Sequence, residues 1–247
     1  MHDELTKFTK IVETLKEHEK HTGLEYYPFN IGNYNEQVST FFQLNYPKDT
    51  VAFCVLSSPS WFETIFLPYI KHNKFLSGNQ DPLDQCISSL FIELKDQFAQ
   101  DSYEIDVIHD FDMGPTRKPK VLVQTAGHVS GAAYYYQKKD VDYPDWKDKK
   151  LYGVSIHPVY GGWFSFRGVL IFRNFQMQLE KKIPEDNLNH EQKVNLLELY
   201  NYKWKDFQYR NVNSPKEKYS EKQQEYFITK PSDRWTLINS WNNSNIS

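Results

Sequence analysis

Residues 151–172 read LYGVSIHPVYGGWFSFRGVLIF and carry the clearest strand signals of the chain. Two apolar runs of strand length, LYGVSIH (151–157) and WFSFRGVLIF (163–172), flank the turn-forming segment PVYGG (158–162). Strand-length runs joined by a short segment that contains glycine are typical of a β-hairpin with a longer loop. We therefore predict that both runs are strands and that they pair with each other.

Arg167 lies in the middle of the second run, where its charge conflicts with its apolar neighbours. Alternation along a strand would place Trp163, Ser165, Arg167 and Val169 on one face. A buried guanidinium needs an anion and several hydrogen-bond acceptors. The anion could be an Asp or Glu of the chain, or a carboxylate or phosphate of a ligand held by two parallel hydrogen bonds. This segment alone leaves both interpretations open.

Helices and strands follow one another elsewhere in no strict β–α–β order. The continuous apolar run 51–57 predicts a buried strand, and 103–109 alternates as a half-buried strand should. Asp81 followed by Pro82 is typical of a helix start. We further predict helices over 4–16, over 61–70 with an end near Pro68, over 188–202, from Ser220 to Phe227 and from Ser232 to Trp241, with 23–35 extended or looped and 242–247 frayed. This order indicates an α+β fold with a mostly antiparallel sheet.

Charge and cysteine usage exclude several classes of protein. Of 247 residues, 29 are Lys or Arg and 32 are Asp or Glu, so the net charge of −3 gives no basic footprint for nucleic acid. No apolar run reaches the length of a membrane span, and the charged start MHDELTKFTK has no signal-peptide core. Cys54 and Cys86 lack zinc-finger spacing, so we expect no bound metal and a cytoplasmic location.

Two biases in composition bear on function. Aromatic residues make up 16% of the chain, which suits either an aromatic-rich core or a wide pocket for a flat ligand. Arginine is rare: the chain has five arginines, Arg117, Arg167, Arg173, Arg210 and Arg234, against 24 lysines. A chain that defaults to lysine places arginine where a rigid fork is needed. Arg210 and Arg234 each have acids nearby in sequence, so each alone predicts a local ion pair.

Histidines and small residues give weaker signals. His18 and His21 lie in a run of charges, which favours a solvated helix end over a metal site. His128 lies in AGHVSG, where Ala126 replaces the Asp of the D-x-H-x-x-G motif with which some cobalamin enzymes ligate cobalt. Without that second partner we expect a hydrogen-bonded histidine and no ligation. The small residues of 126–133 allow close approach of a helix or of a ligand.

Several long motifs, in the same order, resemble the CblC family of cyanocobalamin-processing proteins, named after methylmalonic aciduria and homocystinuria type C. They are DPLDQC (81–86), QTAGHVSGAAYYYQ (124–137), GVSIHPVYGGWFSFRG (153–168) and the spaced pattern W-x-D-x-x-Y-R…P-x-x-x-Y-S-x-x-Q-x-x-Y-F-x-T-x-P-x-x-R (204–234). The resemblance runs from about residue 23 to residue 236. It implies a flavin nitroreductase-like α+β fold as a single domain over 1–247, with 175–247 as a helical cap.

The resemblance also implies the chemistry. One implied activity is flavin-dependent reductive decyanation of cyanocobalamin, with FMN or FAD and with NADPH as the indirect electron source. The other is transfer of an alkyl group from alkylcobalamin to glutathione. Implied partners are a CblD-type protein and a flavin reductase, with no nucleic acid and no membrane. The family resemblance leaves open a non-catalytic cobalamin chaperone and, more distantly, a plain flavin reductase.

Family positions are carried over residue by residue. The glutathione-binding arginines match Arg167, Arg210 and Arg234, three of the five arginines. No side chain is implied as a nucleophile. The cobalamin contacts match Asp110, Val121, Leu122, Val123, Gln124, Tyr135, Tyr136, Gln137, Ser155 and Phe166. The loop 113–119 lacks the paired arginines linked to ligand-promoted dimerisation, so we expect a monomer and leave the homodimer open.

Overall fold

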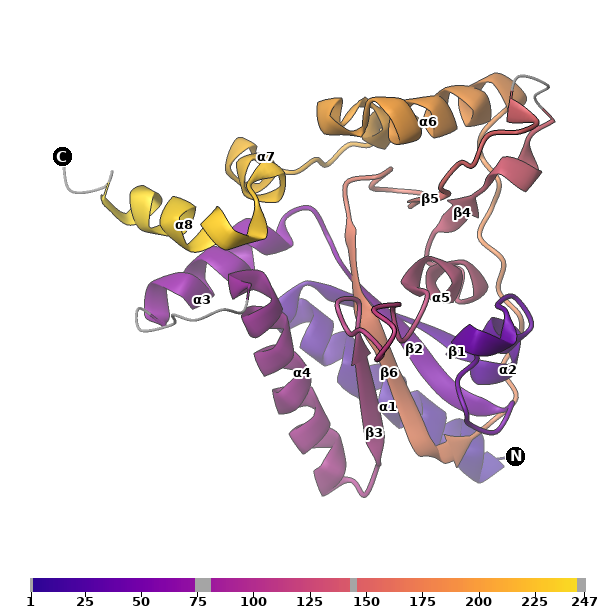
Figure 1. Cartoon of the computed structure of the whole chain (residues 1–247). Coiled ribbons are helices and arrows are strands. Elements are labelled where there is room, and N and C mark those ends of the chain that lie inside the picture. Colours follow the sequence, from indigo (N-terminus) through magenta and orange to yellow (C-terminus); the bar gives the residue numbers. More distant parts are fainter. Residues whose placement is uncertain (1, 74–80, 143–145, 244–247) are drawn as a thin grey trace.

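A four-stranded antiparallel sheet lies at the centre of the protein in the order β1-β2-β6-β3 (Figure 1). The computed structural model describes residues 2–73, 81–142 and 146–243. The strands are β1 (Leu24–Asn30), β2 (Thr50–Ser57), β3 (Ile105–His109) and β6 (Ser165–Gln176). A second, two-stranded sheet pairs β4 (Tyr134–Tyr136) with β5 (Val154–Ile156). The predicted α+β class with an antiparallel sheet is confirmed.

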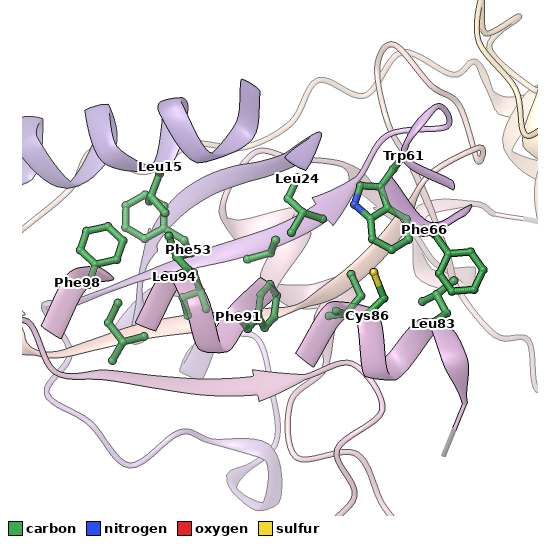
Figure 2. Packing of buried hydrophobic residues seen from close by; sticks show 14 of the residues in the cluster. Leu15, Leu24, Phe53, Trp61, Phe66, Leu83, Cys86, Phe91, Leu94 and Phe98 are labelled. Carbon is green, nitrogen blue, oxygen red and sulfur yellow. The ribbon is translucent and has the colours of Figure 1, made fainter. Parts of the chain in front are cut away.

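Helices cover both faces of the large sheet. On one face, α1 (His2–Thr22) and α4 (Pro82–Gln100) pack on β2 and β6 through aromatic and aliphatic side chains (Figure 2). On the other face lie α2 (Ile31–Asn35) and α5 (Val123–Val129). All eight residues of β2 are buried because both faces are covered, as the continuous apolar run predicts. The rings of Trp61, Phe91 and Phe98 belong to the core, so much of the aromatic content is structural.

The start of α4 follows the predicted capping rule. The Asp81 side chain accepts a hydrogen bond from the Leu83 amide at 3.0 Å, and Pro82 occupies the first turn. Leu83, Ile87, Phe91, Leu94 and Phe98 then recur at helical spacing and are all buried. This helix therefore places the acids of its first turn near one end of the large sheet.

The predicted hairpin is wrong. Strand β5 pairs with β4, with Ser155 opposite Tyr135, whereas β6 pairs with β2 and β3. Both edges of β6 are occupied, so no backbone groups remain for β5. The segment 157–162 contains only an isolated bridge between His157 and Gly161, and it carries the chain from the small sheet to the large one.

Alternation along β6 also fails at one point. Leu56 lies opposite Phe166 and Val55 lies opposite Gly168, which leaves Arg167 as the extra residue of a β-bulge. Gly168 has a φ of 141°, and a Cβ at this position would lie 2.3 Å from the Ile108 carbonyl oxygen. Arg167 consequently faces Trp61 on the α4 side, while Val169 packs with Cys54 on the α5 side. The expectation that Arg167 and Val169 share a face is therefore wrong.

Two further local predictions are corrected. Pro68 does not end the helix over 61–70, because it lies in the first turn of α3 (Leu67–His72), where its missing N–H costs nothing. A π-helical turn, η2 (Phe62–Phe66), leads into α3. Residues 24–30 are extended as expected, but 31–35 are helical. Short 3-10 turns also occur in the described part of the chain, among them η1 (Thr40–Phe42), η3 (Lys138–Asp140), η5 (Trp204–Asp206), η6 (Gln208–Asn211) and η7 (Pro231–Asp233).

The region after β6 is mainly helical. Helix α6 (His190–Tyr202) covers the small sheet through Leu196 and Leu197. Helices α7 (Glu221–Ile228) and α8 (Arg234–Asn243) join the large core through Tyr226 and Ile238. The helix predicted from Ser220 is present, and the Ser220 hydroxyl caps it by accepting the Gln223 amide at 3.0 Å. The tail predicted to be frayed lies outside the described part at residues 244–247. Among the described residues, no helix has the length and apolar content to cross a membrane.

Helix α1 is longer than the predicted 4–16, and its last turns dock on β1 through His18. The Nδ1 atom of His18 lies 2.7 Å from the Tyr26 hydroxyl and 3.1 Å from the Thr22 hydroxyl. Burial lowers the pKa of His18 to about 4. The solvated helix end expected here is therefore wrong for His18 and holds for the exposed His21, which pairs with Glu17 at 3.0 Å.

This contact predicts an acid-sensitive contribution to stability. Between pH 6.5 and pH 4 the unfolded chain binds a proton at His18 that the native protein does not bind, so the free energy of unfolding falls as the pH falls. Compared with His18→Gln, the wild type should lose about 2 kcal/mol more between pH 7 and pH 4.5. Urea unfolding at both pH values measures the difference. Parallel pH profiles for the two proteins would contradict this assignment.

Candidate functional site

Arg167 is 3% exposed and faces the start of α4 from the bulge of β6. Its Nε donates to the Ser57 hydroxyl at 2.9 Å, and its guanidinium carbon lies 5.0 Å from the ring centre of Trp61. A second nitrogen of the fork is buried without any hydrogen-bond partner. No ion pair joins Arg167 to an acid within the described ranges. Of the two interpretations left open by the sequence, the intramolecular salt bridge is therefore absent, and a donor remains available to an anion.

The positive charge of Arg167 affects the pKa of two half-buried carboxyl groups, Asp84 and Asp110. Burial raises the pKa of Asp84 to about 7, with the neighbouring Asp81 and Asp110 adding to the rise and Arg167 opposing it. Burial likewise raises the pKa of Asp110, and the charge of Arg167 again opposes the rise. The backbone amide of Asp110 also donates to the Arg167 carbonyl at 3.3 Å. A carboxyl group that is partly protonated near pH 7 neutralises less of the Arg167 charge than a full carboxylate would, which favours an incoming anion.

Arg210 lies in an aromatic cage. Its guanidinium carbon is 5.0 Å from the ring centre of Tyr219, 5.1 Å from Tyr209 and 5.6 Å from Trp163. One NH group donates to the Gly162 carbonyl, whereas Nε is buried without a partner. The local ion pair expected for Arg210 does not form with any described acid. Cation–π contacts hold this fork instead.

Arg234 is the arginine that does form the expected ion pair. Its NH1 lies 2.5 Å from Asp81 Oδ2, its Nε donates to the Thr229 carbonyl at 3.3 Å, and its guanidinium carbon lies 4.6 Å from the Tyr226 ring centre. The Tyr226 hydroxyl also donates to Asp81, at 2.7 Å. The same carboxylate therefore caps α4, orients Tyr226 and neutralises Arg234.

Shared neighbours connect the three arginines. Trp61, beneath Arg167, stacks on Phe66 at 6.2 Å, and Phe66 contacts Tyr226 at 5.3 Å, beneath Arg234. The Tyr219 hydroxyl, beside Arg210, lies 2.8 Å from the hydroxyl of Ser165, two residues before Arg167 on β6. Residues far apart in sequence thus link the surroundings of the three arginines.

The residues carried over as cobalamin contacts form a second group around α5. Val121 is buried, and the Leu122 amide donates to the Tyr34 hydroxyl at 2.9 Å. The Gln124 amide nitrogen lies 3.4 Å from the Gly153 carbonyl at the start of β5. Val123 and Gln124 begin α5, which contacts both strands of the small sheet and β6. Residues 121–124 are therefore placed next to the β4–β5 pair.

Aromatic side chains of this group pack tightly on glycine. A Cβ on Gly127 would lie 2.4 Å from the Phe166 ring, and one on Gly153 would lie 2.6 Å from the Tyr135 ring. The small residues of α5 therefore serve the approach of a neighbouring ring. Ser155, opposite Tyr135, has a buried hydroxyl with no hydrogen-bond partner. This polar atom and the ring of Tyr135 are the features of the group that suit a ligand with amide side arms.

Three of the carried-over residues are engaged elsewhere. The Tyr136 hydroxyl donates to Asp186 at 3.1 Å, and Tyr136 faces α6 instead of sharing the Tyr135 face. The Gln137 side chain caps the turn η3 together with Asp140. Asp110 lies with Arg167 instead of with the small sheet. The structure therefore brings together residues 121–124, Tyr135, Ser155 and Phe166, and leaves these three apart from them.

A hollow of about 480 Å³ lies on the α6 side of the small sheet, where Tyr134, Tyr136 and Ile156 line it with Lys182 and Asn187. Strand alternation puts Tyr135 and Ser155 on the opposite face. His128 is hydrogen-bonded, as expected: its Nδ1 accepts from the Tyr135 amide at 3.3 Å, and burial lowers its pKa. No cluster of three or more metal-ligating side chains occurs among the described residues.

Sequence reasoning missed the partners of the arginines. Ser57, Trp61 and Asp84 surround Arg167, and Tyr219 packs on Arg210. An acid in the first turn of a helix is common, so Asp84 carried no distinguishing signal. A serine and a tryptophan just after a buried strand are equally ordinary in sequence. Only the packing of α4 against the bulge identifies them.

Comparisons with known proteins agree with the motifs. A model of the methylmalonic aciduria and homocystinuria type C family matches residues 23–238. A Gallus gallus protein named cyanocobalamin reductase / alkylcobalamin dealkylase is 45% identical over 218 residues, covering 87% of this chain and 90% of the relative. A Danio rerio protein of the same name is 40% identical over 235 residues, covering 94% and 93%.

The fold leads to the same family. The crystal structure of a C. elegans B12-trafficking protein CblC matches with a TM-score of 0.83 at 30% identity, covering 96% of this chain and 97% of that one. The resemblance found in the motifs is therefore confirmed over most of the chain. The chain belongs to the methylmalonic aciduria and homocystinuria type C family.

Proposed function

We propose that this protein is a cobalamin-processing enzyme, a cyanocobalamin reductase and alkylcobalamin:glutathione alkyltransferase. The observation that carries the proposal is the pair of buried, unpartnered guanidinium N–H groups on Arg167 and Arg210. Buried donors without acceptors are uncommon and often mark a missing ligand. The family and the names of its relatives support cobalamin as the substrate on which the enzyme acts.

Glutathione fits the arginine group chemically. It carries two carboxylates, and forked guanidinium groups bind carboxylates with two parallel hydrogen bonds. Arg167 offers a free donor, and Arg210 offers Nε. Arg234 must exchange part of its contact with Asp81 for a ligand carboxylate. Nearby guanidinium charge also favours the thiolate form of the ligand, and the thiolate is the nucleophile.

In this proposal the corrin ring lies against the group of residues around α5. There, residues 121–124, Tyr135, Ser155 and Phe166 offer apolar surface and polar atoms. Asp110, Tyr136 and Gln137 are proposed as contacts that would have to move from the partners described above. Cobalamin binds base-off with no protein ligand on cobalt, because His128 accepts the Tyr135 amide on Nδ1, so its Nε2 carries the ring proton and has no lone pair for cobalt. The protein contributes positioning and electrostatics, and no side chain acts as a nucleophile.

Two reactions follow from this placement. In decyanation, one electron added to the cob(III)alamin releases cyanide with its bonding pair and leaves cob(II)alamin. In dealkylation, the glutathione thiolate attacks the cobalt-bound carbon in line. The new carbon–sulfur bond gives a thioether, and the electron pair of the broken cobalt–carbon bond stays on cobalt as cob(I)alamin.

The electron supply and the cellular setting belong to the same proposal. Electrons for decyanation come from a reduced flavin, FMN or FAD, with NADPH as the indirect source through a flavin reductase. We assign no residue of this chain to the flavin. The protein acts in the cytoplasm as a single domain over 1–247 with 175–247 as its cap, and it delivers cobalamin to a CblD-type partner. It is a monomer unless ligand promotes a dimer.

Product formation tests the function directly. Incubating the protein with methylcobalamin and glutathione without oxygen should give S-methylglutathione and cob(I)alamin in equal amounts, detected by mass spectrometry and absorption. Bound methylcobalamin should show the base-off spectrum before glutathione is added. A chaperone would bind cobalamin and form no thioether. A base-on spectrum of the complex would contradict the binding mode.

Substitution of Arg167 separates the two ligands. Arg167→Ala should lower kcat/KM for glutathione by about 100-fold, since charge-assisted hydrogen bonds to a carboxylate are lost, with cobalamin affinity changed less than about threefold. Arg167→Lys should restore only about a tenth of the activity, because an ammonium cannot form the fork. Steady-state dealkylation and absorbance titration measure the two effects. Equal losses for both ligands would contradict the assigned role.

Gly127 offers a matching test on the cobalamin side. Gly127→Ala places a methyl group at 2.4 Å from the Phe166 ring, so the ring must move and cobalamin affinity should fall about tenfold. The double variant Gly127→Ala/Phe166→Leu makes room for the methyl group and should recover part of the loss. Absorbance titration with cobalamin gives the affinities. An unchanged affinity in Gly127→Ala would remove Phe166 from the proposed site.

A further inference from the structure

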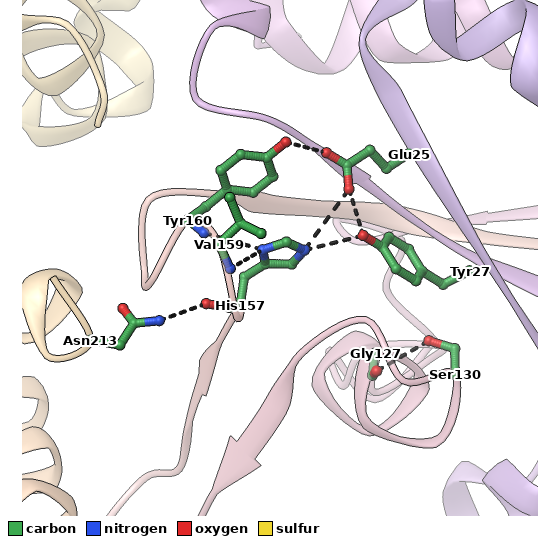
Figure 3. Close-up of polar contacts among 8 residues, drawn as sticks. All are labelled: Glu25, Tyr27, Gly127, Ser130, His157, Val159, Tyr160 and Asn213. Atoms are coloured by element: carbon green, nitrogen blue, oxygen red, sulfur yellow. Dashed lines mark hydrogen bonds and ion pairs between the residues drawn. The ribbon is translucent and has the colours of Figure 1, made fainter. Parts of the chain in front are cut away.

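A partly buried polar network joins β1 to the segment 157–162 that connects the two sheets (Figure 3). The Glu25 carboxylate accepts the Tyr27 hydroxyl on one oxygen and the Tyr160 hydroxyl on the other, both at 2.6 Å. His157 Nε2 lies 3.1 Å from the Tyr27 hydroxyl and 3.9 Å from Glu25. None of these four residues is carried over from the family as a ligand contact.

The hydrogen bonds define the state of His157. Its Nδ1 accepts the backbone amides of Val159 at 3.1 Å and Tyr160 at 3.2 Å, so the neutral ring carries its proton on Nε2. That proton is donated to the Tyr27 oxygen, whose own proton goes to Glu25. The imidazole also stacks on the Tyr160 ring at 4.5 Å. Both ring nitrogens of His157 are therefore engaged, Nδ1 within the segment and Nε2 with β1.

The other side of the same segment holds Arg210. The Gly162 amide donates to the Arg210 carbonyl at 3.0 Å, and the Gly162 carbonyl accepts the Arg210 guanidinium. Asn213 donates to the His157 carbonyl at 3.0 Å. The two backbones touch so closely that a Cβ on Gly161 would lie 2.4 Å from the Arg210 carbonyl oxygen. A shift of the segment must therefore shift Arg210.

We propose that Glu25, Tyr27, His157 and Tyr160 are positioning residues that fix the Arg210 fork for glutathione through segment 157–162. This inference rests on the proposed function for the identity of the ligand. The network itself contacts neither Arg210 nor its aromatic cage, so it acts only through the segment. The rings of Tyr27 and Tyr160 pack in clusters that include Phe166, so the test must keep the rings and remove only the hydroxyls. Removing one phenolic hydroxyl should loosen the segment and misplace Arg210 while the ring packing beside Phe166 is retained.

Kinetics of the single-hydroxyl variants provide the first test. Tyr160→Phe and Tyr27→Phe should raise KM for glutathione about fivefold with kcat changed less than twofold, because lost uniform binding raises KM alone. Flavin-driven decyanation, which uses no glutathione, should be unchanged. Tyr46→Phe is the matched control: it removes a hydroxyl that donates to Asp106 at 2.8 Å on β3, outside the network. This control should leave both activities unchanged.

A double-substitution cycle separates positioning from general stabilisation. In the Arg210→Ala background, Tyr160→Phe should have no further effect on kcat/KM for glutathione, because the fork it positions is absent. An undiminished effect in that background would overturn the proposal, as would an unchanged KM in the single variants. Equal losses in dealkylation and decyanation would also overturn it, since they indicate a purely structural role.

Hydrogen exchange gives a readout that does not depend on activity. Amides of residues 208–213 should exchange about five times faster in Tyr160→Phe than in the wild type or in Tyr46→Phe. Unchanged exchange there would overturn the proposal. If exchange responds but the wild type forms no thioether, the positioning of Arg210 stands and the proposed alkyl transfer fails. The two failures are therefore distinguishable.

Discussion

The buried guanidinium of Arg167 is the constraint on which the candidate site depends. An extra residue in β6 turns this side chain away from the α5 face and against the Trp61 ring. There Ser57 accepts one N–H, and another N–H has no acceptor. Burying a cation without an anion costs free energy, and an anionic ligand would offset that cost. The requirement for Gly168 follows from the same bulge, because the Ile108 carbonyl leaves no room for a Cβ. The bulge in β6 thus leaves Arg167 with a free N–H donor that an anionic ligand would satisfy.

The three arginines differ in what compensates the charge of each guanidinium group. Arg167 has no acid partner within the described ranges, Arg210 is held by rings, and Arg234 is neutralised by Asp81. A dicarboxylate would therefore meet least competition at Arg167 and most at Arg234. The raised pKa of Asp84, at about 7, keeps a further competing carboxylate partly neutral beside Arg167. The three arginines thus differ in how strongly they would attract a ligand carboxylate, although their side chains are chemically identical.

Local features were predictable from sequence and non-local ones were not. The buried strand β2 and the capped start of α4 follow from runs and caps within a few residues of each other. The hairpin failed because partner choice is decided by strands far away in sequence: β2 and β3 occupy both edges of β6. The predicted face of Val169 was wrong because an alternating sequence pattern carries no signal for a β-bulge. For the site, family motifs pointed to the arginines, but Ser57, Trp61 and Asp84 needed the packed structure, and the expected ion pair of Arg210 was replaced by a cage.

The failed hairpin prediction also has a functional side. A hairpin turn would have bound β5 to β6 in one sheet and given a continuous surface. Phe166 of the proposed corrin site lies beside Arg167 on β6. Segment 157–162, however, separates the two sheets, so Tyr135 and Ser155 of that site and the arginines are built on different sheets. Their relative position then depends on how firmly this segment is held. Glycine at 161 and 162 allows backbone contact with Arg210, and the Glu25 carboxylate secures the opposite side. A thiolate must approach the cobalt-bound carbon in line with the cobalt–carbon bond to within a fraction of an ångström, so the stiffness of this segment is as relevant to alkyl transfer as the charges of the arginines.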